Sequence, residues 1–192
     1  MKDLWALKRE FLEHIEIEKG RSVKTVENYD HYLSVFFDFA KVKDPKDLTF
    51  ETLREYRLWL NRRSTGNNRA TGETLQRRTQ NDKHIALRAF LKFLAKRGVS
   101  SLSADQIELA KVPERSLDLI TPDELTRLLK APDSEKDPEL KARGKAILEL
   151  LFSTGLRVSE LCALKRDIDL SLDEITIRGK GGKVRLVFLS PD

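Results

Sequence analysis

The sequence is poor in the features that mark secreted, disulfide-bonded or membrane-spanning proteins. Its 192 residues include one cysteine, so no disulfide framework can form within the chain. No apolar run approaches the roughly 18 residues that a membrane helix needs, and the amphipathic opening is unlike a signal peptide. We therefore expect a soluble, cytoplasmic protein. Cys162 lies in an apolar helical stretch, where we expect a small buried residue rather than a nucleophile or metal ligand.

Basic residues are unevenly distributed along the chain. Hydrophobic residues make up 40% of the sequence, enough for one large or two small globular domains, and the net charge is +5. Residues 1–97 contain 21 Lys and Arg against 14 Asp and Glu, and residues 54–97 alone contain 12 against 3. Most of these twelve are arginine, whose planar guanidinium suits phosphate. The pattern indicates a polyanionic partner, and the alternative is a solvated, lysine-rich helix face.

Four amphipathic helices are predicted in the first half of the chain. They are expected to begin at about Leu4, after Ser22, after Thr49 and at about Thr74. The second should end at Asp44 and Pro45, and the fourth at Gly98. The expected buried face of the fourth helix is Ile85, Ala86, Ala89, Phe90, Phe93 and Leu94.

Eight arginines are expected on the outer faces of the third and fourth helices and on the loop between them, where they would meet DNA. They are Arg54, Arg57, Arg62, Arg63, Arg69, Arg77, Arg78 and Arg88.

A linker and a second domain are predicted after the fourth helix. Helical periodicity lapses over residues 99–117, which separates a domain at 1–98 from one at 118–192. The sequence Thr121-Pro122-Asp123-Glu124 combines an N-cap threonine, a first-turn proline and the glutamate of a capping box, so a helix should begin there. Another is expected over about 139–153. Gly155 should break it, and Arg157 should begin a further helix to about Leu164.

The last segment has the period-two pattern of a β-hairpin. A two-residue turn at Gly181-Gly182 would place Thr176 opposite Val187, Arg178 opposite Arg185, and Lys180 opposite Lys183. The four cations would then share one exposed face near the tip. The other face would be apolar and packed inward, with Ile175, Ile177, Val184, Leu186 and Phe188.

Two motifs resemble those of the tyrosine recombinases, or phage-type integrases, and within them the Xer recombinases that resolve chromosome dimers. They are Ser153-Thr154-Gly155-Leu156-Arg157-Val158-Ser159-Glu160-Leu161 and Gly179-Lys180-Gly181-Gly182-Lys183-Val184-Arg185-Leu186-Val187. Ser22, Thr25 and Tyr29 also have the family's spacing. The resemblance implies a mainly α fold with a small antiparallel β element: a helical SAM-like core-binding domain, then the first part of a mixed α/β catalytic domain.

The resemblance also implies a chemistry. In the family a tyrosine attacks a DNA phosphodiester and forms a 3'-phosphotyrosyl bond, with no metal or nucleotide cofactor. Carried over by motif, Arg157 would clamp the phosphate, Glu160 would support it, and Lys180 would protonate the leaving 5'-oxygen. Arg178, Lys183 and Arg185 would contact DNA and lower the pKa of Lys180.

The family's later His-x-x-Arg motif and nucleophilic tyrosine have no match here. All three histidines, at 14, 31 and 84, lie in the first half, as do Tyr29, Tyr32 and Tyr56. Tyr29 and Tyr56 are expected on core faces and Tyr32 half-buried. We therefore expect a fragment that binds double-stranded DNA at inverted half-sites without cleaving it. The family implies a tetramer on two sites for the full-length form, whereas the fragment could be monomeric.

Two other functions compete with this interpretation. One is a non-catalytic DNA-binding protein that occupies recombination sites, although binding alone would not need Arg157 and Lys180. The other is a helical transcription factor, which is less favoured because the sequence has no recognisable helix-turn-helix.

Overall fold

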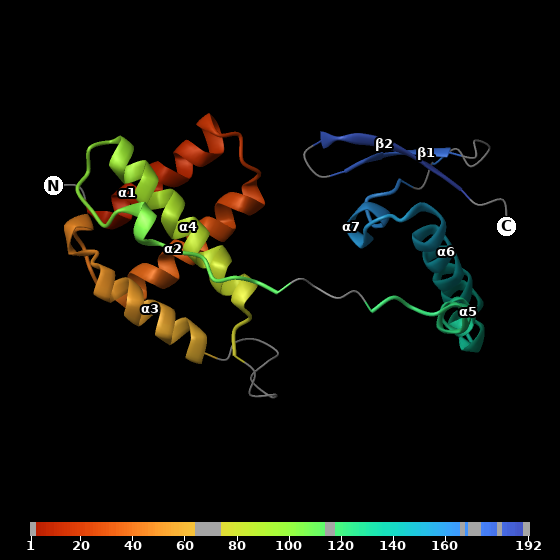
Figure 1. Ribbon diagram of the computed structural model, residues 1–192. Coiled ribbons are helices and arrows are strands. Elements are labelled where there is room, and N and C mark those ends of the chain that lie inside the picture. Colours follow the sequence, from red (N-terminus) through yellow and green to blue (C-terminus); the bar gives the residue numbers. More distant parts are fainter. Residues whose placement is uncertain are drawn as a thin grey trace. The chain divides into compact units, whose positions relative to one another are not determined.

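The computed structural model divides into two compact units, at residues 1–114 and 115–192 (Figure 1). It describes residues 3–63, 74–113, 118–165, 168, 174–179 and 182–189. We call these the first and second units and describe each by itself. The predicted fold class is confirmed: the described residues are mainly helical, with one antiparallel sheet of two strands.

The first unit is helical. Its elements are α1 (Leu4–Glu13), η1 (His14–Glu18), α2 (Val23–Ala40), η2 (Pro45–Asp47), α3 (Phe50–Arg62), α4 (Arg77–Lys96) and η4 (Ala104–Gln106). Thr49 caps α3 as predicted, because its hydroxyl accepts a hydrogen bond from the backbone N–H of Thr52 at 3.2 Å. Helix α2 ends earlier than predicted. Lys41 adopts a left-handed backbone (φ 54°) directly after Ala40, whereas Asp44 instead caps η2.

Aromatic side chains fill the core of the first unit. Helix α4 packs against α1, α2 and α3 (Figure 1), and Phe90 at its centre lies 5.5 Å from Phe11 and 5.6 Å from Phe37 between ring centroids. Tyr56 is fully buried, as expected. One predicted core residue is wrong: Ile85 is 39% exposed, while Leu87 and Leu91 are buried. Ile85 instead lines a hollow between α2 and α4 together with Tyr29 and Tyr32, where its side chain stays accessible to solvent.

The chain that leaves α4 folds back onto the first unit. Ala104 and Ile107, within the predicted linker, are buried in its core. Asn81 fixes the next residues through two hydrogen bonds to the backbone of Ala110, one donated by its side chain (2.9 Å) and one accepted (3.0 Å). Arg57 donates to the carbonyl of Glu108 at 2.7 Å. Residues 104–110 therefore belong to the first unit, because their apolar side chains and backbone groups both find partners there.

The second unit combines three helices with a hairpin. Its elements are α5 (Pro122–Lys130), η5 (Ala131–Ser134), α6 (Pro138–Thr154), α7 (Val158–Leu161), β1 (Glu174–Arg178) and β2 (Val184–Phe188). The capping box at Thr121 and Glu124 is confirmed. Gly155 ends α6 in a left-handed conformation (φ 61°), as predicted. Helix α7 is shorter than expected, and Cys162 follows its last residue. The prediction of a buried cysteine is wrong, because Cys162 is exposed, whereas Leu161 and Leu164 on either side of it pack against the core.

The predicted hairpin register is wrong by one residue. Ile175 pairs with Val187, Ile177 with Arg185, and Arg178 with Val184. The pair formed by Arg178 and Val184 leaves residues 179–183 between the strands, a longer connection than the two-residue turn predicted. A slip of one residue turns every side chain of a strand to the other face. Arg185 and Val187 therefore share the inner face with the buried isoleucines of β1, and the outer face carries the exposed Val184, Leu186 and Phe188.

Candidate functional site

Arg157 lies at the junction between α6 and α7. Gly155 reverses the chain at the end of α6, and the buried Leu156 anchors the turn in the apolar core of the second unit. Arg157 is then the residue before the first turn of α7, with an extended backbone. Its side chain is 66% exposed. The local sequence thus places a guanidinium at a helix start with access to solvent.

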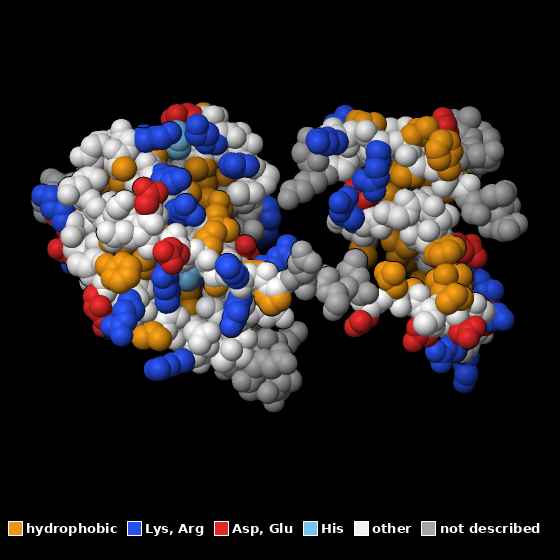
Figure 2. Space-filling model, viewed as in Figure 1, with side chains coloured by type: hydrophobic (Ala, Val, Ile, Leu, Met, Phe, Trp, Pro, Cys, Tyr) orange, Lys and Arg blue, Asp and Glu red, His pale blue; other side chains and the backbone are white. Residues whose placement is uncertain are grey.

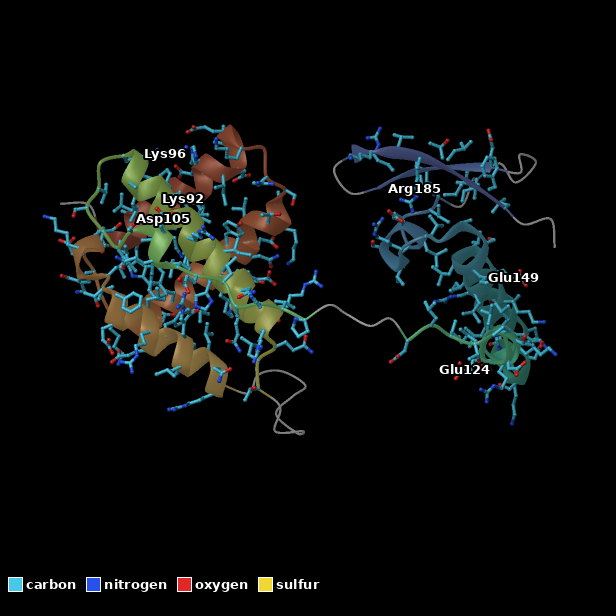
Figure 3. All side chains as sticks on the ribbon, viewed as in Figure 1. Lys92, Lys96, Asp105, Glu124, Glu149 and Arg185 are labelled. Atoms are coloured by element: carbon cyan, nitrogen blue, oxygen red, sulfur yellow. The ribbon has the colours of Figure 1, made fainter. Side chains whose placement is uncertain are left out.

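Glu160 holds the backbone and side chain of Arg157 from the first turn of α7. Its carboxylate accepts the backbone N–H of Arg157 at 2.9 Å and the Nη1 of that residue at 3.0 Å. Arg185 reaches the same carboxylate from β2 with both guanidinium nitrogens, Nη1 to Oε1 at 3.1 Å and Nη2 to Oε2 at 2.8 Å. Figure 3 shows Arg185 directed from the hairpin toward α7. These hydrogen bonds, from Arg185 first and then from Arg157, lower the pKa of Glu160 to about 2.

The turn of the hairpin begins against this cluster. The N–H of Gly179 donates to the carbonyl of Lys183 at 2.7 Å, and the N–H of Gly182 donates to the carbonyl of Gly179 at 3.2 Å. A Cβ at Gly179 would lie 3.1 Å from Nη1 of Arg185 and 3.2 Å from Oε1 of Glu160. The backbone can approach the carboxylate so closely because residue 179 has no side chain.

Four hairpin cations were predicted to share one face, and the three that the structure describes do not all do so. Arg178 and Lys183 are exposed, whereas Arg185 lies on the inner face and is paired with Glu160. Lys180 lies outside the described residues. Its convergence with Arg157 on one phosphate stays a prediction, as do all the assigned roles. The acid partner of Arg185 was missed because it depends on the register of the hairpin. In the sequence, only the three-residue spacing of Arg157 and Glu160, typical of a capping box, pointed to a role for Glu160 at this helix start.

The arginines of the first unit have different environments. Four are exposed toward the ends of α3 and α4 that flank residues 64–73: Arg62, Arg63, Arg77 and Arg78. Arg63 lies 4.6 Å above the ring of Trp59. Arg54 is exposed and paired with Glu51 at 2.8 Å. Figure 2 shows basic side chains spread over the visible face of this unit. Arg69 lies outside the described residues.

Two of the predicted DNA contacts, Arg57 and Arg88, are partly covered by the protein itself. Arg57 is half-buried and its guanidinium holds the backbone of residue 108, so part of its hydrogen-bonding capacity is already used. Arg88 is half-buried as well, and its Nε is enclosed without a hydrogen-bond partner among the described residues. The motif residues Thr25 and Tyr29 line a hollow of about 280 Å³ between α2 and α4.

In the part of the chain that the structure describes, no group of three or more His, Cys, Asp or Glu side chains could hold a metal ion. Among those same residues, the helices are too short or too polar to cross a bilayer.

Comparison with known proteins assigns a family to both units. Residues 9–98 match the N-terminal SAM-like domain of phage integrases, and residues 118–192 match the phage integrase family. The chain therefore belongs to the phage integrase family, the tyrosine recombinases. Within that family it is a Xer-like member. It is 35% identical over 179 residues to tyrosine recombinase XerC of Bacillus pumilus (92% of this chain, 56% of that protein).

The chain is also similar to a second XerC protein and to a solved structure. Tyrosine recombinase XerC of Xanthomonas campestris pv. campestris (strain B100) is 35% identical over 182 residues, covering 92% of this chain and 52% of the relative. A crystal structure of XerA recombinase matches 96% of this chain and 59% of its own, with 27% identity and a TM-score of 0.39. The chain thus spans little more than half the length of these relatives.

Proposed function

We propose that the chain is the DNA-holding part of a site-specific recombinase, with Arg157 as the phosphate clamp and Lys180 as the proton donor. The supporting observation is that two segments remote in sequence meet at one carboxylate. Glu160 bonds Arg157 directly, and it lies against Gly179, the residue before Lys180. Lys180 follows Gly179 directly in the sequence, which supports assigning both cations to one site.

These two cations suit phosphoryl transfer on DNA. A transition state at phosphorus gains negative charge on its oxygens, and one well-placed donor of this kind is worth about 3 to 4 kcal/mol of the barrier. An ammonium at the leaving 5'-oxygen can give up its proton more readily when other cations are near. Arg178 and Lys183 are the exposed cations around Lys180 in the hairpin. Arg185 is neutralised by Glu160 and contributes less.

The first unit would hold the duplex through its exposed arginines, in particular Arg62, Arg63, Arg77 and Arg78. The site needs no metal or nucleotide cofactor. By the same family argument, the complete protein would act in the cytoplasm on DNA with inverted half-sites, as a tetramer on two sites. The 192 residues by themselves would bind DNA without forming a covalent link, because their three tyrosines are in the first unit: Tyr56 is fully buried, and Tyr29 and Tyr32 are half-buried.

The test measures DNA affinity by fluorescence anisotropy between 50 and 200 mM salt. The logarithm of the affinity should fall by about 0.9 per log unit of salt for each phosphate neutralised. Arg157→Gln and Lys180→Gln should each reduce that slope by about 0.9. Arg143→Gln, at an exposed position on α6, is the matched control and should leave it unchanged. Binding that does not depend on salt would refute the proposal.

A second measurement tests the chemistry. A nicked substrate that traps covalent intermediates should give no protein-linked 3' end with these 192 residues. A linked product on a denaturing gel would show that one of the three tyrosines reaches the phosphate after all.

A further inference from the structure

Glu160 has one negative charge and two arginine partners. Arg185 engages both carboxylate oxygens, at 3.1 and 2.8 Å, whereas Arg157 engages one, at 3.0 Å. The cluster as a whole therefore has one positive charge in excess. The Arg157 side chain is 66% exposed and that of Arg185 37%, so the excess charge is more accessible at Arg157.

We propose that Arg185 is a positioning residue rather than a DNA contact: it occupies Glu160, which leaves the Arg157 guanidinium available for a phosphate and fixes the hairpin against α7. This inference rests on the proposed function, because it assumes that Arg157 binds phosphate.

The reason lies in the geometry of a guanidinium. Its planar fork satisfies both oxygens of a carboxylate at once, which a lysine ammonium cannot do with the same directionality. Without Arg185, Arg157 would be the strong partner left to Glu160, which lies three residues away at the start of α7. Glu160 would then draw Arg157 into a closer pair, and its charge would repel an approaching phosphate.

The same bond fixes the hairpin. Arg185 is on β2, and Gly179 at the start of the turn lies against the pair that Arg185 makes with Glu160. The bond therefore sets where Gly179, and with it the start of the turn, stands relative to the start of α7. This charged pair links β2 directly to α7, so its loss would loosen the start of the turn relative to Arg157.

A double-mutant cycle on the 192-residue chain separates positioning from direct contact. DNA affinity is measured by anisotropy at fixed salt for the wild type, Arg185→Gln, Glu160→Gln and the double variant. Arg185→Gln should weaken binding about tenfold in the presence of Glu160 and no more than about threefold in its absence. Arg178→Gln, on the outer face of the same hairpin, is the matched control and should weaken binding equally in both backgrounds.

The conservative variant guards against loss of folding. Arg185→Lys keeps the charge but not the fork, so its affinity should lie between those of the wild type and Arg185→Gln, with an unchanged salt slope. Equal effects of Arg185→Gln in both backgrounds, with a slope lower by about 0.9, would make Arg185 a direct phosphate ligand and overturn the inference. So would an Arg185→Lys variant that binds like the wild type.

Failure of the two proposals gives different results. If the wild type shows no salt-dependent binding to DNA, the proposed function fails and the positioning role fails with it. If the wild type binds as expected but residues 185 and 160 are not coupled, the positioning role alone fails.

Discussion

The two units are held together by different means. The first buries aromatic and aliphatic side chains from four helices in one continuous core. The described core of the second is small, with four buried apolar residues, Leu156, Ile175, Ile177 and Val187. Neither α5 nor α6 fully buries a residue, so caps and the charged cluster at Glu160 do more to define the second unit. A site built from charged groups is therefore found in the unit with less apolar packing.

The sequence allows each unit to be observed separately. Both tryptophans, at positions 5 and 59, and all three tyrosines are in the first unit, so intrinsic fluorescence reports on it alone. Cys162 is exposed in the second unit and is the one cysteine of the chain, so a dye attached there reports on that unit. The comparison can thus be tested within a single polypeptide.

The largest expected effect is in the core of the first unit. Phe90→Ala should reduce its free energy of unfolding by about 3 to 5 kcal/mol, because the ring is fully buried between Phe11 and Phe37. Urea denaturation followed by tryptophan fluorescence measures the change. Ile85→Ala on the same helix is the control and should cost less than about 1 kcal/mol. Equal losses for the two variants would contradict the burial pattern of α4.

Acid should weaken the two units over different ranges of pH. Burial lowers the pKa of His84 below its ordinary value of 6.5 and outweighs the hydrogen bond between its Nδ1 and the carbonyl of Gln80 (2.7 Å), which acts in the opposite direction. The unfolded chain then binds a proton that the folded unit excludes. The first unit should lose stability as the pH falls below about 6.5, at no more than about 1.4 kcal/mol per pH unit from this group.

The second unit should resist down to a lower pH. The pKa of Glu160 is lowered from 4.5 to about 2, so its contribution is complete above about pH 4.5 and is lost as the pH falls toward 2. Denaturation at a series of pH values, read from tryptophan and from the dye on Cys162, measures both. His84→Gln should flatten the first profile and Glu160→Gln the second. A first unit that is stable to pH 5 would show that His84 can accept a proton in place.

The smallest effect concerns residues 104–110. Asn81→Ala removes both hydrogen bonds to Ala110, at about 1 kcal/mol each, so trypsin should cleave after Lys111 about five- to thirtyfold faster. Mass spectrometry of the products measures the rate. Asn61→Ala, in the neighbouring helix, is the control and should not change it. An unchanged rate in Asn81→Ala would mean that Ala104 and Ile107 alone hold the segment.

The helices were predictable because their signals are local. The caps at Thr49 and Thr121 and the break at Gly155 each depend on residues within one turn of helix. The errors arose where neighbours distant in sequence decide. Ile85 fits the periodicity of α4 but lines a hollow between α2 and α4 that is open to solvent. The exposure of Cys162 depends on how Leu161 and Leu164 on either side of it pack. The partners of Arg57 and Asn81 lie 51 and 29 residues away.

The sequence by itself determined that the chain has a helical lobe rich in arginine, and it placed Arg157 at the start of a helix. Those features follow from local spacing and residue chemistry. The tertiary structure alone decided the register of the hairpin, and with it that Arg185 meets Glu160 rather than solvent. Side chains alternate between the two faces of a strand, so a shift of one residue exchanges the faces. Only packing against neighbouring elements decides which face points inward.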